Sequence, residues 1–240
     1  MLALEAIDLA IAPKEFAAIL GPSGCGKSTL LNMVAGFDVP TRGRVLAGGA
    51  PVDGPDPRRA VVFQEAALFP WYTVHDNTTF GPKTRGVPAH AYAPRVATVL
   101  EQVGLTGFER HYPADLSGGM KQRVAIARVL VMEPEILLMD EPFGSLDAQT
   151  RSVMQELLLT VWERSQQTVL FITHDIEEAL LLADSVSVMT ARPGRIKRRL
   201  VVDLPRPRSL DVTMSPRFTE LKREVLALIR EESLRVARQG

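Results

Sequence analysis

Short apolar runs alternate with amphipathic stretches along this chain of 240 residues. The runs are rich in Val, Ile, Leu and Phe, and they lie at Phe16–Leu20, Ala60–Phe63, Ile136–Met139, Thr168–Ile172 and Ser185–Met189. Continuous apolar runs of this length are typical of buried parallel strands. Lys27–Ala35, closed by Gly36, and Gln149–Arg164 place apolar residues at helical spacing, the second with Met154, Leu157, Leu158, Val161 and Trp162 on one face. Strands that alternate with helices predict an α/β fold.

Two regions depart from this alternation. Residues 71–131 contain helical patterns and Gly/Pro breaks without a core strand, which predicts a mostly helical subdomain inserted in an α/β core of about residues 1–70 and 132–204. After Pro205 and Pro207, helical spacing predicts a C-terminal helical extension over about residues 205–240, with a packing face made of Phe218, Leu221, Val225, Leu228 and Ile229. We therefore expect one domain with two helical additions.

Composition excludes several classes of protein. Lys and Arg number 28, as do Asp and Glu, so no global field recruits nucleic acid or an anionic membrane. The single cysteine, Cys25, excludes an intramolecular disulfide and a cysteine zinc cluster, which fits a reducing cytoplasm. No basic leader precedes Glu5 and Asp8, and no apolar run reaches the roughly 18 residues that a spanning helix needs. We expect a chain that is neither exported nor embedded.

One basic cluster stands out, formed by Arg192, Arg195, Lys197, Arg198 and Arg199. Such a cluster could contact anionic lipid or nucleic acid, but a solvated face is the favoured interpretation.

The first predicted strand leads directly into a phosphate-binding motif. This segment is Gly21-Pro22-Ser23-Gly24-Cys25-Gly26-Lys27-Ser28-Thr29, and a helix follows it, which is the context that a P-loop requires. The glycines let backbone N–H groups surround phosphates, and the helix N-terminus adds positive potential. Lys27 is predicted to reach the β- and γ-phosphates, and the Ser28 hydroxyl to ligate Mg²⁺. Cys25 is interpreted as a small filler.

An acidic pair closes the strand predicted at Ile136–Met139. Asp140 is placed to hold Mg²⁺, usually through water, and Glu141 to polarise the water that attacks the γ-phosphate. Alone, such a pair is more often a helix cap, but its position after a P-loop favours the second phosphate-site motif.

A third motif narrows the choice of family. Leu116-Ser117-Gly118-Gly119-Met120-Lys121-Gln122-Arg123 resembles the signature sequence of ABC ATPases, although many relatives carry Gln where this chain has Met120. Ser117, Gly118 and Gly119 form another anion cradle that opens a predicted helix, Met120–Val131. The resemblance implies a head-to-tail homodimer, in which each ATP lies between the P-loop of one subunit and the signature of the other.

Further segments resemble the same family in order and spacing. Gln64 matches the Q-loop, Ser145-Leu146-Asp147 the D-loop, and His174 the switch histidine. By resemblance, Gln64 senses Mg²⁺ and the attacking water, Asp147 connects the two sites of the dimer, and His174 contacts the γ-phosphate. Together with Glu141, the resemblance makes Gln64 and His174 the catalytic residues, with ATP and Mg²⁺ as cofactors.

In detail the chain looks like the ATPase subunits of nitrate, sulfonate and taurine importers. The residues that carry this likeness are Val61–Gln64, Leu68–Trp71, Asp76-Asn77, Glu141–Gly144, Thr173–Ala179 and Ala191–Ile196. The likeness implies a peripheral ATPase at the cytoplasmic face of the inner membrane. Its partners would be an integral membrane permease and, indirectly, a periplasmic or lipid-anchored substrate-binding protein. Residues about Glu65 to Phe80 would receive the coupling helix of the permease, with Trp71 either in that contact or in the core.

The chain departs from the family at its beginning. ABC ATPases normally start with a strand whose aromatic residue stacks on adenine, whereas 20 residues precede Gly21 here. We expect either a start codon assigned too late, which is favoured, or an ATP site that binds weakly or borrows another aromatic.

The alternative function is a non-transport ABC ATPase that acts on nucleic acid or the ribosome. Such proteins need coiled coils or a second cassette, and the sequence contains neither. No nucleic-acid partner is therefore expected.

Overall fold

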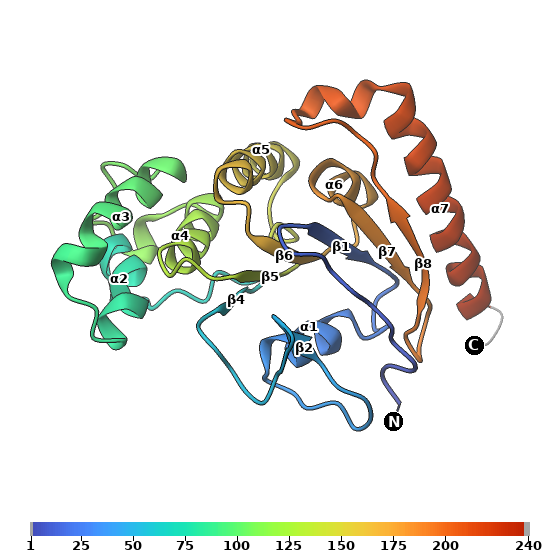
Figure 1. Ribbon diagram of the computed structural model, residues 1–240. Helices are drawn as coiled ribbons and strands as arrows, with labels where there is room; N and C mark the ends of the chain where they lie inside the picture. The colour runs from blue at the N-terminus through green and yellow to red at the C-terminus, as the bar shows by residue number, and fades with distance from the viewer. Residues whose placement is uncertain (1, 238–240) are drawn as a thin grey trace.

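A six-stranded sheet in the order β4-β5-β6-β1-β7-β8 runs through the protein in a computed structural model that describes residues 2–237 (Figure 1). The strands are β1 (Phe16–Leu20), β4 (Arg59–Val62), β5 (Ile136–Asp140), β6 (Thr168–Ile172), β7 (Ser185–Met189) and β8 (Ile196–Val201), beside a separate hairpin of β2 (Leu46–Ala47) and β3 (Ala50–Pro51). The α-helices are α1 (Lys27–Ala35), α2 (Val74–Thr84), α3 (Ala89–Gln102), α4 (Gly118–Leu130), α5 (Ala148–Ser165), α6 (Ile176–Leu182) and α7 (Pro216–Ala237). Two 3₁₀ turns, η1 (Pro113–Asp115) and η2 (Leu210–Met214), complete the described elements.

The five predicted strands all form, and they pair in parallel. The bounds of β4 correct one expectation, because Phe63 lies beyond the strand and is 42% exposed, with its ring stacked on Phe37 at a centroid distance of 6.4 Å. The antiparallel edge strand β8 was not predicted from the sequence. Its consecutive charged residues, Lys197 to Arg199, hide the alternation that marks a half-buried strand.

Alternate residues of the sheet face two different layers of helices. Ile19, Leu138 and Leu170 pack with Leu30 and Leu31 of α1 and with the N-terminal segment around Leu4 to Ile11. Their neighbours along the strands, Phe16, Leu137 and Phe171 among them, pack on the other face with α4, α5 and α6. Because side chains alternate across a strand, α1 and α4 lie on opposite faces of the sheet (Figure 1).

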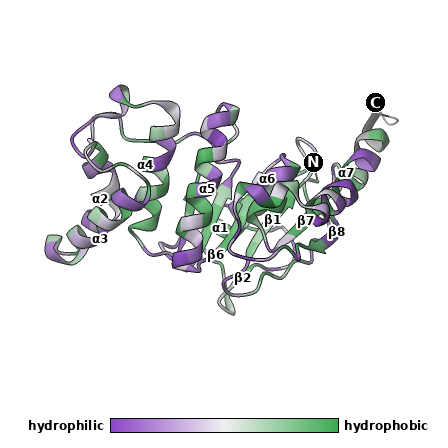
Figure 2. Cartoon of the chain, turned by 90° about the horizontal axis from the view of Figure 1, so that it is seen from above, coloured by the Kyte–Doolittle hydropathy of each residue, from purple (hydrophilic) through white to green (hydrophobic). Residues whose placement is uncertain are grey.

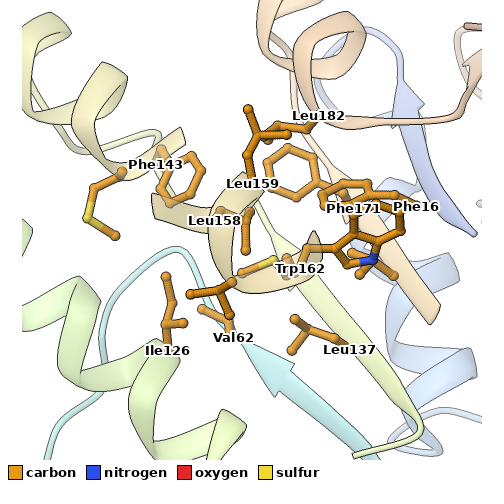
Figure 3. Packing of buried hydrophobic residues seen from close by; sticks show 14 of the residues in the cluster. Phe16, Val62, Ile126, Leu137, Phe143, Leu158, Leu159, Trp162, Phe171 and Leu182 are labelled. Carbon is orange, nitrogen blue, oxygen red and sulfur yellow. The ribbon is translucent and has the colours of Figure 1, made fainter. Parts of the chain in front are cut away.

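The layer beneath α5 is an aromatic core (Figure 3). The Phe16 ring centroid lies 5.7 Å from both the Trp162 and the Phe171 ring centroids. The predicted inward face of this helix is buried at Met154, Leu158, Val161 and Trp162, whereas Leu157 is half-buried and Leu159 is buried instead. In Figure 2 the central strands are mostly hydrophobic and the hydrophilic positions lie on the surrounding helices and loops. Burying each large apolar side chain of this core stabilises the fold by about 1.5–3 kcal/mol.

Residues 71–131 carry α2, α3, η1 and α4 and no strand, as the predicted fold class requires. α4 begins two residues earlier than expected, because Ser117 caps it by accepting a hydrogen bond from the Met120 N–H at 3.3 Å. The domain boundaries themselves stay a prediction, and Met1 and residues 238–240 of the predicted core and extension lie outside the described part of the chain.

The C-terminal segment is anchored by a buried guanidinium. Arg208 is 7% exposed and donates to five backbone carbonyls, three at the end of α6 and two in the irregular segment that follows β8. The acceptors are the oxygens of Leu180, Leu181, Ala183, Val202 and Leu204, at 2.7 to 3.4 Å. The segment is completed by α7, whose predicted face packs through buried Phe218, Leu221 and Val225 and half-buried Leu228 and Ile229. Burial lowers the pKa of Arg208 to about 10, which is still far above neutral pH.

The basic cluster of the sequence lies along β8 and the turn before it, and every member except Lys197 is exposed, which agrees with the favoured interpretation of a solvated face. Four of its five residues form ion pairs: Arg195 with Glu5, Lys197 with Glu231 and Glu232, Arg198 with Glu224, and Arg199 with Glu15. The fifth, Arg192, donates to the Leu2 carbonyl at 3.4 Å. The acidic partners thus neutralise the charge that a polyanion would bind.

No helix among the described residues is long and apolar enough to cross a bilayer.

Candidate active site

The loop between β1 and α1 has the backbone that a phosphate cradle needs. Gly24 and Gly26 have φ angles of 75° and 102°, a region that favours glycine. Gly26 caps α1 without a side-chain hydrogen bond, so the first N–H groups of the helix point into the loop. The Lys27 ammonium is buried and donates to the Gly21 and Pro22 carbonyls at 2.8 and 3.1 Å. These two hydrogen bonds hold the Lys27 side chain within the phosphate loop.

Two distant segments close over the back of this loop. A Cβ on Gly194 would lie only 2.0 Å from the Cys25 carbonyl oxygen, and a Cβ on Gly26 would lie 2.6 Å from Leu4 Cδ2. Leu4 and Gly194 form a parallel bridge, in which the Glu5 N–H donates to the Gly194 carbonyl at 2.9 Å. From the sequence, Gly194 was only part of Ala191–Ile196, one of the segments that resemble the importer subunits. The structure makes it a direct neighbour of the phosphate loop.

Cys25 itself is buried, and its burial raises the pKa of the thiol. A buried, protonated thiol is a poor nucleophile, which agrees with the interpretation of Cys25 as a filler.

Ser28 and Asp140 meet at the mouth of the loop. The Ser28 hydroxyl lies beside the Asp140 carboxylate and favours its ionised form, while burial, the larger effect, raises the pKa of Asp140. A hydroxyl and a carboxylate are hard oxygen donors of the kind that Mg²⁺ prefers. The side chains present therefore fit a magnesium ion that would also take oxygen ligands from a phosphate.

Glu141 and His174 form the next pair. The Glu141 carboxylate lies 2.9 Å from His174 Nδ1, and the two residues follow β5 and β6, which are neighbours in the sheet. Glu141 adopts a left-handed backbone with φ 44°, uncommon for a residue with a side chain and often seen at functional sites. The sequence predicted both residues but not their contact.

Gln64 joins this pair at Gly144. A Cβ placed on Gly144 would lie 3.1 Å from Gln64 Nε2 and 3.6 Å from Glu141 Oε2, so both side chains approach the same point. The three predicted catalytic side chains therefore lie together at the carboxyl ends of β4, β5 and β6.

The predicted signature lies apart from the phosphate loop of its own chain. It opens α4, on the opposite face of the sheet from α1, and Ser117 and Gly118 are exposed. Gly119 is buried against Thr150, where a Cβ would lie 2.5 Å from Cγ2 of that residue. Asp147 caps α5 nearby, accepting from the Thr150 N–H at 3.0 Å. The signature thus packs against the D-loop segment.

A second surface feature lies over α2. Phe69, Trp71, Tyr72 and Phe80 form a cluster of rings with centroid separations of 4.6 to 6.2 Å. Beside it, a hollow of about 310 Å³ is lined by Tyr72, Asp76, Phe80, Lys83 and Thr84. Trp71 is 66% exposed, which decides against the core-packing alternative left open by the sequence.

Asn77 fixes the loop that carries these rings. Its buried amide accepts from the Phe69 N–H at 2.9 Å and donates to the Phe69, Tyr72 and Thr73 carbonyls at 3.0 to 3.1 Å. The exposed aromatic cluster is therefore held on a rigid support.

The ABC transporter family profile matches residues 4–144. The taurine import ATP-binding protein TauB of Burkholderia thailandensis is 48% identical over 234 residues, covering 95% of this chain and 89% of the relative. The nitrate import ATP-binding protein NrtD of Synechocystis is 45% identical over 236 residues, covering 96% of this chain and 89% of the relative.

Solved structures of similar chains have the same fold. The structure of cbiO1 from Clostridium perfringens, part of the ABC transporter complex cbiONQ, superposes with a TM-score of 0.77 at 32% identity, covering 99% of this chain and 90% of that one. A dimeric ATP-binding cassette bound to ADP and Pi in a post-hydrolysis state has a TM-score of 0.72 at 32% identity, covering 85% and 92%. The predicted α/β fold with a P-loop core is confirmed.

Proposed function

Because the chain belongs to the ABC transporter family, we propose that it is the ATP-hydrolysing subunit of an importer for a small anion such as a sulfonate or nitrate. The observation that carries the hydrolytic part is the contact between Glu141 and His174 at 2.9 Å, beside Gln64 and next to the phosphate loop in the sheet order. Relatives named for taurine and nitrate import support the choice of solute class.

In this proposal each side chain at the strand ends has a defined task. The phosphate loop, Gly21 to Thr29, surrounds the phosphates with N–H groups, and Lys27 exchanges its two loop carbonyls for phosphate oxygens. Ser28, Asp140 and Gln64 would hold Mg²⁺, which would offset negative charge on the phosphates. Glu141 accepts a proton from the attacking water. His174 orients that carboxylate and contacts the γ-phosphate.

The proposal also requires a head-to-tail homodimer. Within one chain the exposed Ser117 and Gly118 belong to a helix on the far side of the sheet from α1. A second copy can bring its Ser117, Gly118 and Gly119 to the nucleotide that the first copy holds. Closure of the dimer on ATP and its opening after hydrolysis would supply the motion for transport.

The ring cluster over α2 is proposed as the contact with a membrane permease. Exposed aromatic rings beside a hollow are typical of protein interfaces, and these rings are held in place by Asn77. A chain bound in this way would lie at the cytoplasmic face of the inner membrane. A substrate-binding protein would act on the permease from the other side.

The experiment isolates the tagged chain from gently solubilised native membranes and identifies its partners by mass spectrometry. We expect a multispanning permease to copurify with the wild-type chain and with Phe108→Ala, an exposed aromatic that is not a member of the ring cluster. Trp71→Ala should lose the permease. Recovery of ribosomal proteins or nucleic acid in place of a permease would refute the importer and favour a non-transport ABC ATPase.

A further inference from the structure

Helices α5 and α6 are joined by two polar contacts, one buried and one about one-third exposed, and these contacts form what we term the polar seam. Arg151 and Gln155 lie one turn apart on α5, and they face Asp175 and Glu178 of the α6 N-terminus. The Arg151 guanidinium lies 3.7 Å from the Asp175 carboxylate, and Gln155 Nε2 donates to Glu178 Oε1 at 3.1 Å. The two contacts therefore follow one another along both helices.

The seam holds the backbone on both sides of His174. The Thr173 hydroxyl lies beside the Glu178 carboxylate, and that hydroxyl accepts from the Asp175 N–H at 3.0 Å. Asp175 in turn caps α6 by accepting from the Glu177 and Glu178 N–H groups at 2.8 and 3.1 Å. The residue before His174 and the residue after it are therefore both tied to the seam.

The other end of the seam reaches the D-loop segment. Arg151 Nη2 donates to the Leu146 carbonyl at 2.9 Å, and Leu146 lies between Ser145 and Asp147. A small hollow of about 10 Å³ separates this guanidinium from the catalytic pair, lined by Glu141, Arg151, Thr173, His174 and Glu178 among others. One side chain thus contacts both the D-loop segment and the neighbour of the switch histidine.

Apolar side chains could join these helices at less desolvation cost. Glu178 is 3% exposed and Gln155 8%, and burying polar or ionised groups is unfavourable unless all partners are in place. Buried polar groups instead favour one register of the two helices, because other registers would leave these groups without hydrogen-bond partners. A shift of α5 would have to carry the segment around His174 with it.

We propose that Arg151 is a positioning residue, which couples the D-loop segment to His174 and so sets how His174 meets Glu141. This inference rests on the proposed hydrolysis of ATP, and it adds a regulatory connection inside each subunit. Because the D-loop lies toward the second copy in the proposed dimer, the seam would transmit the arrival of that copy to His174.

The test uses the purified full-length chain and a double-mutant cycle. Arg151→Met removes the charge and keeps most of the volume, and Asp175→Asn removes the charge and keeps a good helix cap. We expect each single variant to lower kcat about tenfold, and the double variant to be little worse than Arg151→Met, because both changes break the same link. The affinity for a fluorescent, methylanthraniloyl-labelled ATP should stay within about twofold of wild type, since no phosphate contact is altered.

Val161→Ala is the control for lost packing, because Val161 is buried on the same helix, away from the seam. It should lower the Tm and keep kcat. Unchanged kcat in Arg151→Met, or a loss in the double variant equal to the product of the single losses, overturns the proposal.

A second measurement does not depend on hydrolysis. The imidazole NMR resonance of His174, assigned with His174→Ala, should shift in Arg151→Met and stay in place in Val161→Ala. An unshifted resonance in Arg151→Met overturns the coupling. A wild-type chain without ATPase activity would instead refute the proposed function, and the resonance would still decide this inference.

Discussion

Gly194→Ala changes one methyl group far from the phosphate loop in sequence, yet we expect it to impair ATP binding. The new Cβ would lie 2.0 Å from the Cys25 carbonyl oxygen and 2.8 Å from Met189 Cε. Real Cβ contacts essentially never fall below 3.0 Å, so the two backbones must separate by about 1 Å. The φ angle of Gly194 is not in the left-handed region, so the backbone itself accepts alanine and the contact alone causes the effect.

The size of the effect follows from overpacking. Inserting a methyl into a closely packed site costs about 1–3 kcal/mol, and we expect the free energy of unfolding to fall by that amount. If the phosphate loop moves to relieve the contact, it must return to bind phosphate, and the same energy weakens ATP binding by about 5- to 150-fold.

Chemical denaturation and titration with labelled ATP measure the two quantities. Gly54→Ala is the matched control, because a Cβ there meets nothing within 4 Å and its φ is not left-handed. Wild-type affinity together with a wild-type denaturation midpoint in Gly194→Ala would refute the reasoning.

Three further predictions concern buried or reacting groups. Glu141→Gln should retain ATP binding and lower the rate of phosphate release by about 10²- to 10⁴-fold, because a general base is lost, and rapid turnover would remove Glu141 from that role. Because burial raises the pKa of the Cys25 thiol, iodoacetamide should label Cys25 more slowly in the native than in the denatured chain, as followed by mass spectrometry. Labelled protein should no longer bind ATP, which a titration with ATP measures. Burial also raises the pKa of Glu178 above its ordinary 4.5, so ionised Glu178 lowers the free energy of unfolding. This loss of stability is complete above the folded pKa and disappears as the pH falls and the carboxylate is protonated. Glu178→Gln should therefore raise the free energy of unfolding more at pH 8 than at pH 5, and equal changes at the two pH values would contradict this.

The parts that could be predicted from the sequence are those whose cause is local. β1 and α1 have the predicted bounds, because a continuous apolar run, a glycine-rich loop and a closing Gly36 are contiguous in the chain. β8 could not be predicted, since its charged residues are neutralised by Glu15, Glu224 and Glu232, which come from other elements.

The same distinction applies to the site. The identities of Glu141 and His174 follow from motifs. Their contact at 2.9 Å depends on β5 lying beside β6 in the sheet, and this strand order is a property of the fold and not of either motif. Gly194 and Arg151 act through contacts with residues that no motif pairs with them. A glycine directly after Pro193 was the one visible sign, and it indicates a turn before it indicates a contact.

The buried guanidinium of Arg208 has a consequence for how the molecule opens. Because its hydrogen bonds connect the end of α6 with the irregular segment after β8, neither segment can unfold locally without leaving carbonyls unsatisfied in the interior. The two segments should therefore behave as one foldon, whose amide protons exchange with solvent deuterium at a common opening free energy. Protease cleavage after residue 204 would then loosen α6, the helix that begins next to His174, although the cut lies outside every nucleotide-binding motif.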